Sequence, residues 1–274
     1  MKFTKMQGAG NDYVYVNCFE EKVDNVHEAA RKISDRHFGV GSDGLVLICP
    51  SDIADFKMEM YNADGTQAEM CGNAIRCVAK YVHDRGLTDK TSVSIETLAG
   101  IKYLELNTDE QGMVKTVRVN MGKPELCAKN IPIDTDLENF ISEKISVEDK
   151  EYEVTGVSMG NPHAVVFVDE MPDLEHLGPL FENHKMFPKR INTEFVKVID
   201  RHTLEMRVWE RGAGETLACG TGACASMVAA KLADLVDSEA EIILLGGKLK
   251  IEWDGGCVFM TGPCEFVFDG EIDI

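Results

Sequence analysis

Residues 57–73 of the chain read KMEMYNADGTQAEMCGN, and residues 205–221 read EMRVWERGAGETLACGT. Each stretch opens with an alternating segment typical of a β-strand, passes through a glycine-containing loop and ends in a Cys-Gly pair before an apolar helical pattern. Eight residues separate Asn62 from Cys71, and eight separate Glu210 from Cys219. The two stretches therefore predict the same local structure twice in one chain.

A second pair of similar segments lies upstream of each copy. Residues 10–16 read GNDYVYV and residues 160–168 read GNPHAVVFV, in both cases a Gly-Asn turn followed by an alternating strand. Gly10 precedes Cys71 by 61 residues, and Gly160 precedes Cys219 by 59. Because both matches occur in the same order at nearly the same separation, we infer an internal duplication rather than a coincidence among 24 glycines and nine cysteines.

The remaining pattern is mostly that of short strands. Alternating or β-branched segments predict strands at residues 12–18, 45–49, 56–61, 92–96, 114–120, 164–168, 203–209 and 249–253. Helical periodicity predicts helices at 23–36, with Asp24 or Asn25 as the cap, and at 73–85 and 221–236. The expected fold class is α/β (α+β), with a mixed or mostly antiparallel sheet.

The composition is acidic and otherwise that of a folded protein. The 274 residues include 28 Lys and Arg against 47 Asp and Glu, so the formal net charge is −19. Such a chain lacks the basic footprint that nucleic acids or anionic membranes require. No apolar run approaches the roughly 18 residues of a spanning helix, and the odd number of cysteines is a poor disulfide framework. We expect a cytoplasmic protein with reduced thiols.

The two Cys-Gly pairs are the candidate catalytic positions, because each precedes a predicted helix. A thiol at the start of a helix lies beside unpaired N–H groups and the positive end of the dipole, which favour its thiolate form and can also hold a carboxylate. Two such helix ends, facing each other across a pseudo-twofold, would present Cys71 and Cys219 to opposite faces of a small acid. One thiolate could then remove a proton while the other thiol delivers one, without any cofactor.

Other roles for the cysteines fit less well. A zinc site from Cys71, Cys77, Cys219 and Cys224 would need closer ligand pairs than these spacings give, so no metal is expected. Cys77 and Cys224 read as small buried hydrophobes. A disulfide between Cys71 and Cys219 is chemically feasible, and we interpret it as oxidative damage rather than function.

Residues 62–76, NADGTQAEMCGNAIR, resemble the signature of diaminopimelate epimerases, with Thr66 where the family usually has Ser. Further similarity extends over nearly the whole chain, at residues 8–12, 36–41, 119–122, 158–163, 210–216 and 218–222. The resemblance implies a cofactor-independent epimerase that interconverts L,L- and meso-diaminopimelate for lysine and peptidoglycan precursor synthesis. It also implies a homodimer whose subunit has two domains, each a curled mixed sheet around a central helix, with the active site in the cleft between them. The domains would be 1–118 plus 262–274, and 119–261.

The same resemblance assigns site residues. Cys71 and Cys219 would be the acid and base, tuned by His163 and Glu210. Substrate would contact Asn11, Asn62, Gly72, Asn73, Asn161, Asn192, Glu210, Arg211, Gly220 and Thr221, with Arg211 suited to a bidentate grip on a carboxylate. Gly44 stands where some members have Gln, so that contact is absent or is made by Ser42 or Asp43.

Several alternatives remain open at this level. Proline and hydroxyproline racemases typically have His where this chain has Asn73, and the phenazine-type isomerases lack the cysteine pair. A pyridoxal-phosphate racemase would need a Schiff-base lysine and a phosphate cradle, which the sequence does not suggest. A further alternative is a non-enzymatic ligand-binding protein with a degenerate epimerase fold. Loss of either Cys71 or Cys219 would favour it, and both are present. Asn11 and Asn161 could be turn residues only, and Glu210 with Arg211 could be a surface pair.

Overall fold

The computed structural model describes residues 1–273. These residues form two compact units, one of Met1–Asn120 together with the segment from Thr261 onward, the other of Met121–Met260. We call them unit 1 and unit 2. No helix in the described range is long and apolar enough to span a membrane.

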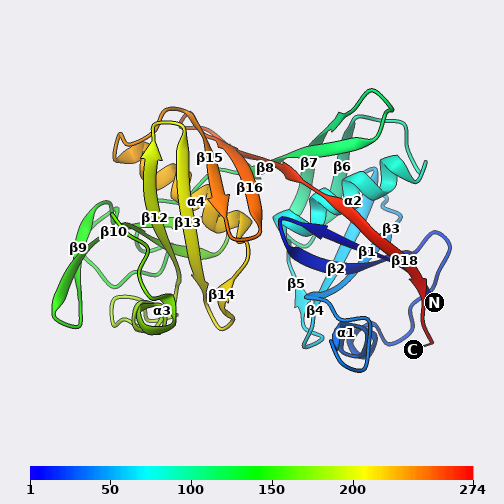
Figure 1. Ribbon diagram of the computed structural model, residues 1–274, viewed down its shortest axis with the longest axis horizontal. Helices are drawn as coiled ribbons and strands as arrows, with labels where there is room; N and C mark the ends of the chain where they lie inside the picture. The colour runs from blue at the N-terminus through cyan, green and yellow to red at the C-terminus, as the bar shows by residue number, and fades with distance from the viewer. Residues whose placement is uncertain (274) are drawn as a thin grey trace. The chain divides into compact units, whose positions relative to one another are not determined.

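Both units combine many strands with two helices each (Figure 1). In unit 1 lie β1 (Lys2–Gly8), β2 (Asn11–Asn17), α1 (Val26–Ser34), β3 (Gly44–Cys49), β4 (Phe56–Asn62), β5 (Gln67–Ala68), α2 (Gly72–Asp84), β6 (Ser92–Thr97), β7 (Gly100–Thr108) and β18 (Glu265–Glu271). In unit 2 lie β9 (Glu143–Val147), β10 (Lys150–Ser158), β11 (Pro162–Phe167), α3 (Leu174–Glu182), β12 (Asn192–Asp200), β13 (Thr203–Glu210), β14 (Gly214–Thr216), α4 (Gly220–Leu232), β15 (Glu239–Leu244) and β16 (Gly247–Glu252). The chain crosses the division within β8 (Val114–Gly122) and β17 (Val258–Pro263).

The strand pairing repeats between the units. In unit 1, β2 is antiparallel to β1 and parallel to β3, β3 is antiparallel to β4, and β4 is parallel to β6. In unit 2, β11 is antiparallel to β10 and parallel to β12, β12 is antiparallel to β13, and β13 is parallel to β15. The register also corresponds, because Tyr13 faces Gly44 in unit 1 and His163 faces Asn192 in unit 2. The predicted duplication is confirmed at the level of strand order.

Helices α2 and α4 are the central helices of their units. Each has 13 residues, and nearly every residue in its first three turns is buried. Helix α2 packs on β1, β2 and β7, and α4 packs on β10 to β13 and on β15 and β16, so α4 is enclosed by its own sheet (Figure 1). A helix that is apolar on all sides is expected in such a position. The mixed sheet around a central helix agrees with the predicted fold class.

The predicted helix boundaries are partly wrong. Helix α1 begins at Val26 rather than Val23 because Asn25 has a left-handed backbone, with φ 48°, which interrupts the helix. Helix α4 ends at Leu232, since Asp234 just beyond it is also left-handed at φ 56°. Helix α3 is not predicted, because Gly178 and Pro179 break its pattern. Its Gly178 packs against β13, where a Cβ atom would lie 2.3 Å from the ring of Trp209.

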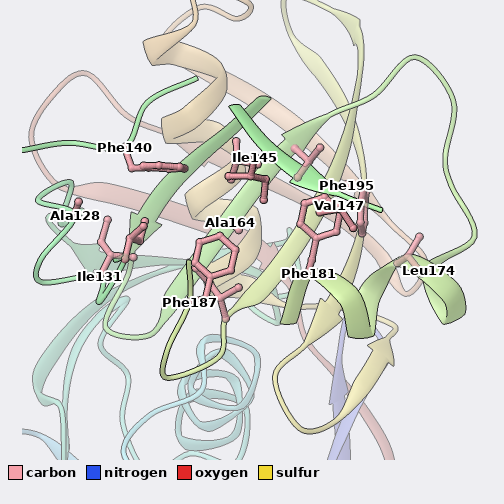
Figure 2. Packing of buried hydrophobic residues seen from close by; sticks show 14 residues of the cluster. Ala128, Ile131, Phe140, Ile145, Val147, Ala164, Leu174, Phe181, Phe187 and Phe195 are labelled. Atoms are coloured by element: carbon pink, nitrogen blue, oxygen red, sulfur yellow. The ribbon is translucent and has the colours of Figure 1, made fainter. Parts of the chain in front are cut away.

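A hydrophobic cluster of aliphatic and aromatic side chains forms much of the core of unit 2 (Figure 2). The ring of Phe181 on α3 lies edge-on to Phe195 on β12 and to Tyr152 on β10, with centroids 5.4 and 5.2 Å away. Edge-to-face pairs of this kind stabilise beyond the apolar area they bury. The packing holds α3 against β12.

Candidate active site

Both cysteines lie at the start of a central helix, as predicted. Cys71 is the N-cap of α2 and Cys219 is the N-cap of α4, and both have an extended backbone, with φ −133° and −117°. Gly72 and Gly220 follow as the first helical residues. The N–H groups in the first turn of a helix have no backbone acceptor within the helix, and a helix start of this kind can bind an anion.

Asn11 joins the first cysteine to an acidic group. The Cys71 thiol donates to Asn11 Oδ1 at 3.4 Å, and Asn11 Nδ2 donates to Asp43 Oδ2 at 2.6 Å. Asp43 also accepts from Arg36 at 3.0 Å. Asn11 is therefore a contact of the cysteine and not only a turn residue. We call Cys71, Gly72, Asn73, Asn11 and Asp43 the Cys71 half-site.

The structure distinguishes the two residues that could compensate for Gly44. Ser42 is buried and donates to the Gly44 carbonyl at 2.9 Å, so its hydroxyl is engaged inside the fold. Asp43 instead contacts Asn11 and is the residue associated with the Cys71 half-site. A Cβ atom at Gly44 would lie 2.1 Å from the Tyr61 carbonyl oxygen and 2.9 Å from Tyr13 Cε1. This backbone therefore has no room for a side chain at position 44.

Tyr13 is a neighbour of this half-site and was not predicted from the sequence. It lies two residues after Asn11 on β2, on the same face of the strand, and is 5% exposed. Burial raises the pKa of Tyr13 well above its usual value, and the charges of Cys71 and Asp43 raise it further. The internal repeat could have indicated Tyr13, because its equivalent in the second copy is His163.

The other predicted residues of unit 1 differ in their surroundings. Asn73 is buried in the first turn of α2. Asn62 ends β4, and its side chain donates to Thr66 Oγ1 at 3.0 Å within the following turn. A substrate contact of Asn62 stays a prediction.

Cys219 is almost completely enclosed by its neighbours. Its side chain accepts from Gly222 N at 3.4 Å and lies 3.4 Å from Thr221 Oγ1, and the residue is 6% exposed. Burial raises the pKa of Cys219 well above its usual value, and the nearby carboxylates of Glu210 and Glu194 raise it further. The expected shift toward thiolate is therefore wrong for Cys219, because desolvation and two carboxylates outweigh the hydrogen bonds from the helix start.

His163 is held from both sides in unit 2. It is fully buried, with Nδ1 at 2.7 Å from Glu194 Oε1 and Nε2 at 3.0 Å from Asn161 Oδ1. Asn161 and His163, two neighbouring predicted residues, are thus brought together. Glu194 was not predicted, although a carboxylate directly before the apolar pair Phe195-Val196 of β12 was a usable signal. We call Cys219, Gly220, Thr221, Asn161, His163, Glu194 and Glu210 the Cys219 half-site.

Glu210 and Arg211 do not form the ordinary surface pair that their sequence allows. Glu210 accepts a hydrogen bond from Thr216 Oγ1, and burial raises its pKa. Arg211 is exposed and donates from Nη1 to the Lys189 carbonyl at 3.2 Å. Asn192 accepts from Arg211 N at 2.9 Å and donates to the Pro162 carbonyl at 2.8 Å, so it fixes the backbone on both sides.

Each half-site thus combines a thiol, the N–H groups of a helix start and an asparagine at, or directly before, the first residue of a strand that has a parallel partner. A carboxylate can be bound by the N–H groups while the thiol exchanges a proton with the adjacent carbon. The half-sites differ in charge, because the Cys219 half-site also contains a buried histidine and two glutamates.

Sequence relatives agree in one family. A family model described as diaminopimelate epimerase matches residues 3–127 and 155–267. A diaminopimelate epimerase of Acetivibrio thermocellus is 61% identical over 278 residues, which cover 100% of this chain and 99% of that protein. Diaminopimelate epimerases of Agathobacter rectalis and Methanococcus maripaludis are 58% and 57% identical, with 100% of each chain covered.

Solved structures share the fold at low identity. A hydroxyproline epimerase from Agrobacterium vitis gives a TM-score of 0.72 at 14% identity, covering 99% of this chain and 90% of that one. A phenazine biosynthesis protein from Bacillus anthracis gives 0.69 at 18% identity, covering 100% and 99%. At these identities the similarity concerns the fold alone.

Proposed function

The chain belongs to the diaminopimelate epimerase family, and from that premise we propose that it interconverts L,L- and meso-diaminopimelate with Cys71 and Cys219 as paired base and acid. The observation that carries the two-thiol mechanism is the repeated position of the cysteines. Each caps the central helix of one duplicated unit, with a Cys-Gly pair at the helix start. The reaction inverts one carbon, so it needs proton transfer on two faces, and a duplicated thiol supplies both transfers.

The two cysteines would work in sequence. One thiolate removes the α-proton, the other thiol delivers a proton to the opposite face, and the roles reverse in the reverse reaction. Since burial and neighbouring carboxylates favour the protonated form of Cys219, we propose that Cys219 is the proton donor in the resting enzyme. Cys71 would then begin the cycle as the base.

Backbone N–H groups would hold the reacting carboxylate. Gly72 and Asn73 start α2, and Gly220 and Thr221 start α4. Donors fixed at the helix starts stabilise the charge that develops on the carboxylate as the α-proton leaves. The exposed guanidinium of Arg211 would bind the distal carboxylate. Asn11, Asn62, Asn161 and Asn192 would complete substrate binding, and His163 and Glu210 would tune the nearby thiol.

Further features belong to the same proposal. The two units would be domains of residues 1–118 plus 262–274 and of residues 119–261. The enzyme would be a cytoplasmic homodimer that needs no pyridoxal phosphate, metal or other cofactor. Its product would supply the synthesis of lysine and of peptidoglycan precursors.

Proton NMR in D2O tests the activity and the thiol roles together. Reduced enzyme with L,L-diaminopimelate should give the meso isomer with deuterium at the inverted α-carbon. Cys71→Ala and Cys219→Ala should each abolish inversion, because one remaining thiol serves one face only. L-proline is the control for the related racemases. Epimerisation by either alanine variant would refute the two-thiol mechanism, and exchange of proline alone would refute the substrate.

A further inference from the structure

The Cys219 half-site contains a carboxylate oxygen without a bonding partner. Glu194 is fully buried, and its Oε1 lies 2.7 Å from His163 Nδ1. Its Oε2 is also buried and has no hydrogen-bond partner anywhere in residues 1–273. A buried polar oxygen in this state is destabilising, so its retention requires a reason other than the stability of the fold.

The duplicated unit shows that the fold itself does not require this carboxylate. His163 faces Asn192 across the parallel pair β11 and β12, and Glu194 follows Asn192 by two residues on the same face. In unit 1, Tyr13 faces Gly44, so the position equivalent to Glu194 is Val46, which is fully buried. Unit 1 therefore packs an aliphatic side chain at the position on β3 where unit 2 packs an acid on β12. We attribute the acid at this position of unit 2 to the chemistry of the Cys219 half-site rather than to the packing of the fold.

Gly222 connects the carboxylate to the thiol. Its backbone N–H donates to Cys219 Sγ at 3.4 Å. A Cβ atom on Gly222 would lie 2.5 Å from Glu194 Oε1. One residue of the first turn of α4 thus touches both groups, so the position of the carboxylate and the position of the thiol are coupled through it.

We propose that Glu194 is a positioning residue of the Cys219 half-site, which fixes the orientation of the His163 ring and sets the protonation of the Cys219 thiol. The role in catalysis rests on the proposed function, because it matters there only if Cys219 transfers a proton. The His163 ring is held by Asn161 Oδ1 at Nε2 and by Glu194 Oε1 at Nδ1. Removing Glu194 would free the ring and change the field at the thiol.

Two further ionisable groups face the pair of His163 and Glu194, each from a different element. Cys219 lies at the start of α4, Glu210 lies on β13, and the pair itself joins β11 to β12. Asn161 contributes an uncharged amide. Glu210 remains in every variant below, so a change at position 194 is measured against a constant background.

Alkylation of Cys219 gives a readout that does not depend on activity. The rate of modification by iodoacetamide is followed as a function of pH, with the Cys219 peptide quantified by mass spectrometry. Glu194→Gln keeps the shape of the side chain and removes its charge. We expect the midpoint to move to lower pH by on the order of one unit, since a carboxylate in a partly desolvated site disfavours a neighbouring thiolate by about that amount. Glu175→Gln, an exposed change on α3, should leave the midpoint unchanged.

A spectrum of His163 tests the positioning role directly. In 15N-labelled enzyme, Glu194→Val copies the residue of unit 1 and should change the Nδ1 and Nε2 signals of His163, while Glu175→Val should not. In the epimerase assay, Glu194→Gln should lower kcat at least tenfold, change KM less than twofold and shift the pH profile.

The outcomes separate this inference from the proposed function. If folded Glu194→Gln has the alkylation midpoint of the wild type and folded Glu194→Val has its His163 spectrum, Glu194 does not position this half-site and the inference is overturned. If the midpoint and spectrum change but the wild type does not epimerise diaminopimelate, the positioning role stands and the proposed substrate is refuted. Unfolding temperatures of all variants identify any loss caused by misfolding.

Discussion

Replacing Gly222 by alanine tests the contact between α4 and Glu194 through stability. Helix propensity alone predicts that Gly222→Ala stabilises α4 by up to about 1 kcal/mol. The structure predicts the opposite sign, because the new Cβ atom would lie 2.5 Å from Glu194 Oε1 and 3.2 Å from Cδ and Cγ. To reach an ordinary contact of 3.4 Å the carboxylate must move by about 0.9 Å, away from its bond to His163.

The expected magnitude follows from these opposing effects. Overpacking a dense interior destabilises by about 1–3 kcal/mol, so after the gain in propensity the variant should lose about 1 kcal/mol of unfolding free energy. The assay is urea denaturation of wild type, Gly222→Ala, Glu194→Val and the double variant. Because valine removes the carboxylate, the alanine should be tolerated better in the double variant, with a coupling energy of about 1 kcal/mol or more. Equal effects of Gly222→Ala in both backgrounds would refute the contact.

Two further predictions concern buried polar groups. Asp84→Asn should destabilise the protein by about 3–5 kcal/mol in urea denaturation, because the buried Lys80 ammonium, 2.6 Å from Asp84 Oδ2, loses its counter-charge. Burial raises the pKa of Asp84, but hydrogen bonds, first that from Lys80, lower it overall. The stability from this pair is therefore present above about pH 4 and is lost as the pH falls through the lowered pKa. An equal loss of stability at acid pH in Asp84→Asn would contradict this. Asn192→Ala removes the bonds to Arg211 N and the Pro162 carbonyl and should destabilise by about 1–3 kcal/mol. Asn192→Ala should also raise KM more than it lowers kcat in steady-state assays, and an unchanged KM would exclude a role in holding Arg211.

Local sequence patterns were sufficient for the features that depend on neighbouring residues. Helical periodicity predicted the starts of both central helices to within one residue, because the period of buried positions along a helix is set by the local sequence. The order of the two matches predicted the duplication that the strand pairing confirms. The resemblance of residues 62–76 to diaminopimelate epimerases predicted the family.

Tertiary structure decided the features that depend on residues far apart in the chain. His163 and Glu194 are 31 residues apart and meet because β11 and β12 pair in parallel with one particular register. Burial, and then the carboxylates of Glu210 and Glu194 on other strands, raise the pKa of Cys219. The local rule for a thiol at a helix start includes neither effect. Helix α3 likewise forms around Gly178 and Pro179 because Phe181 packs on the sheet, and a tertiary contact of this kind has no local sequence signal.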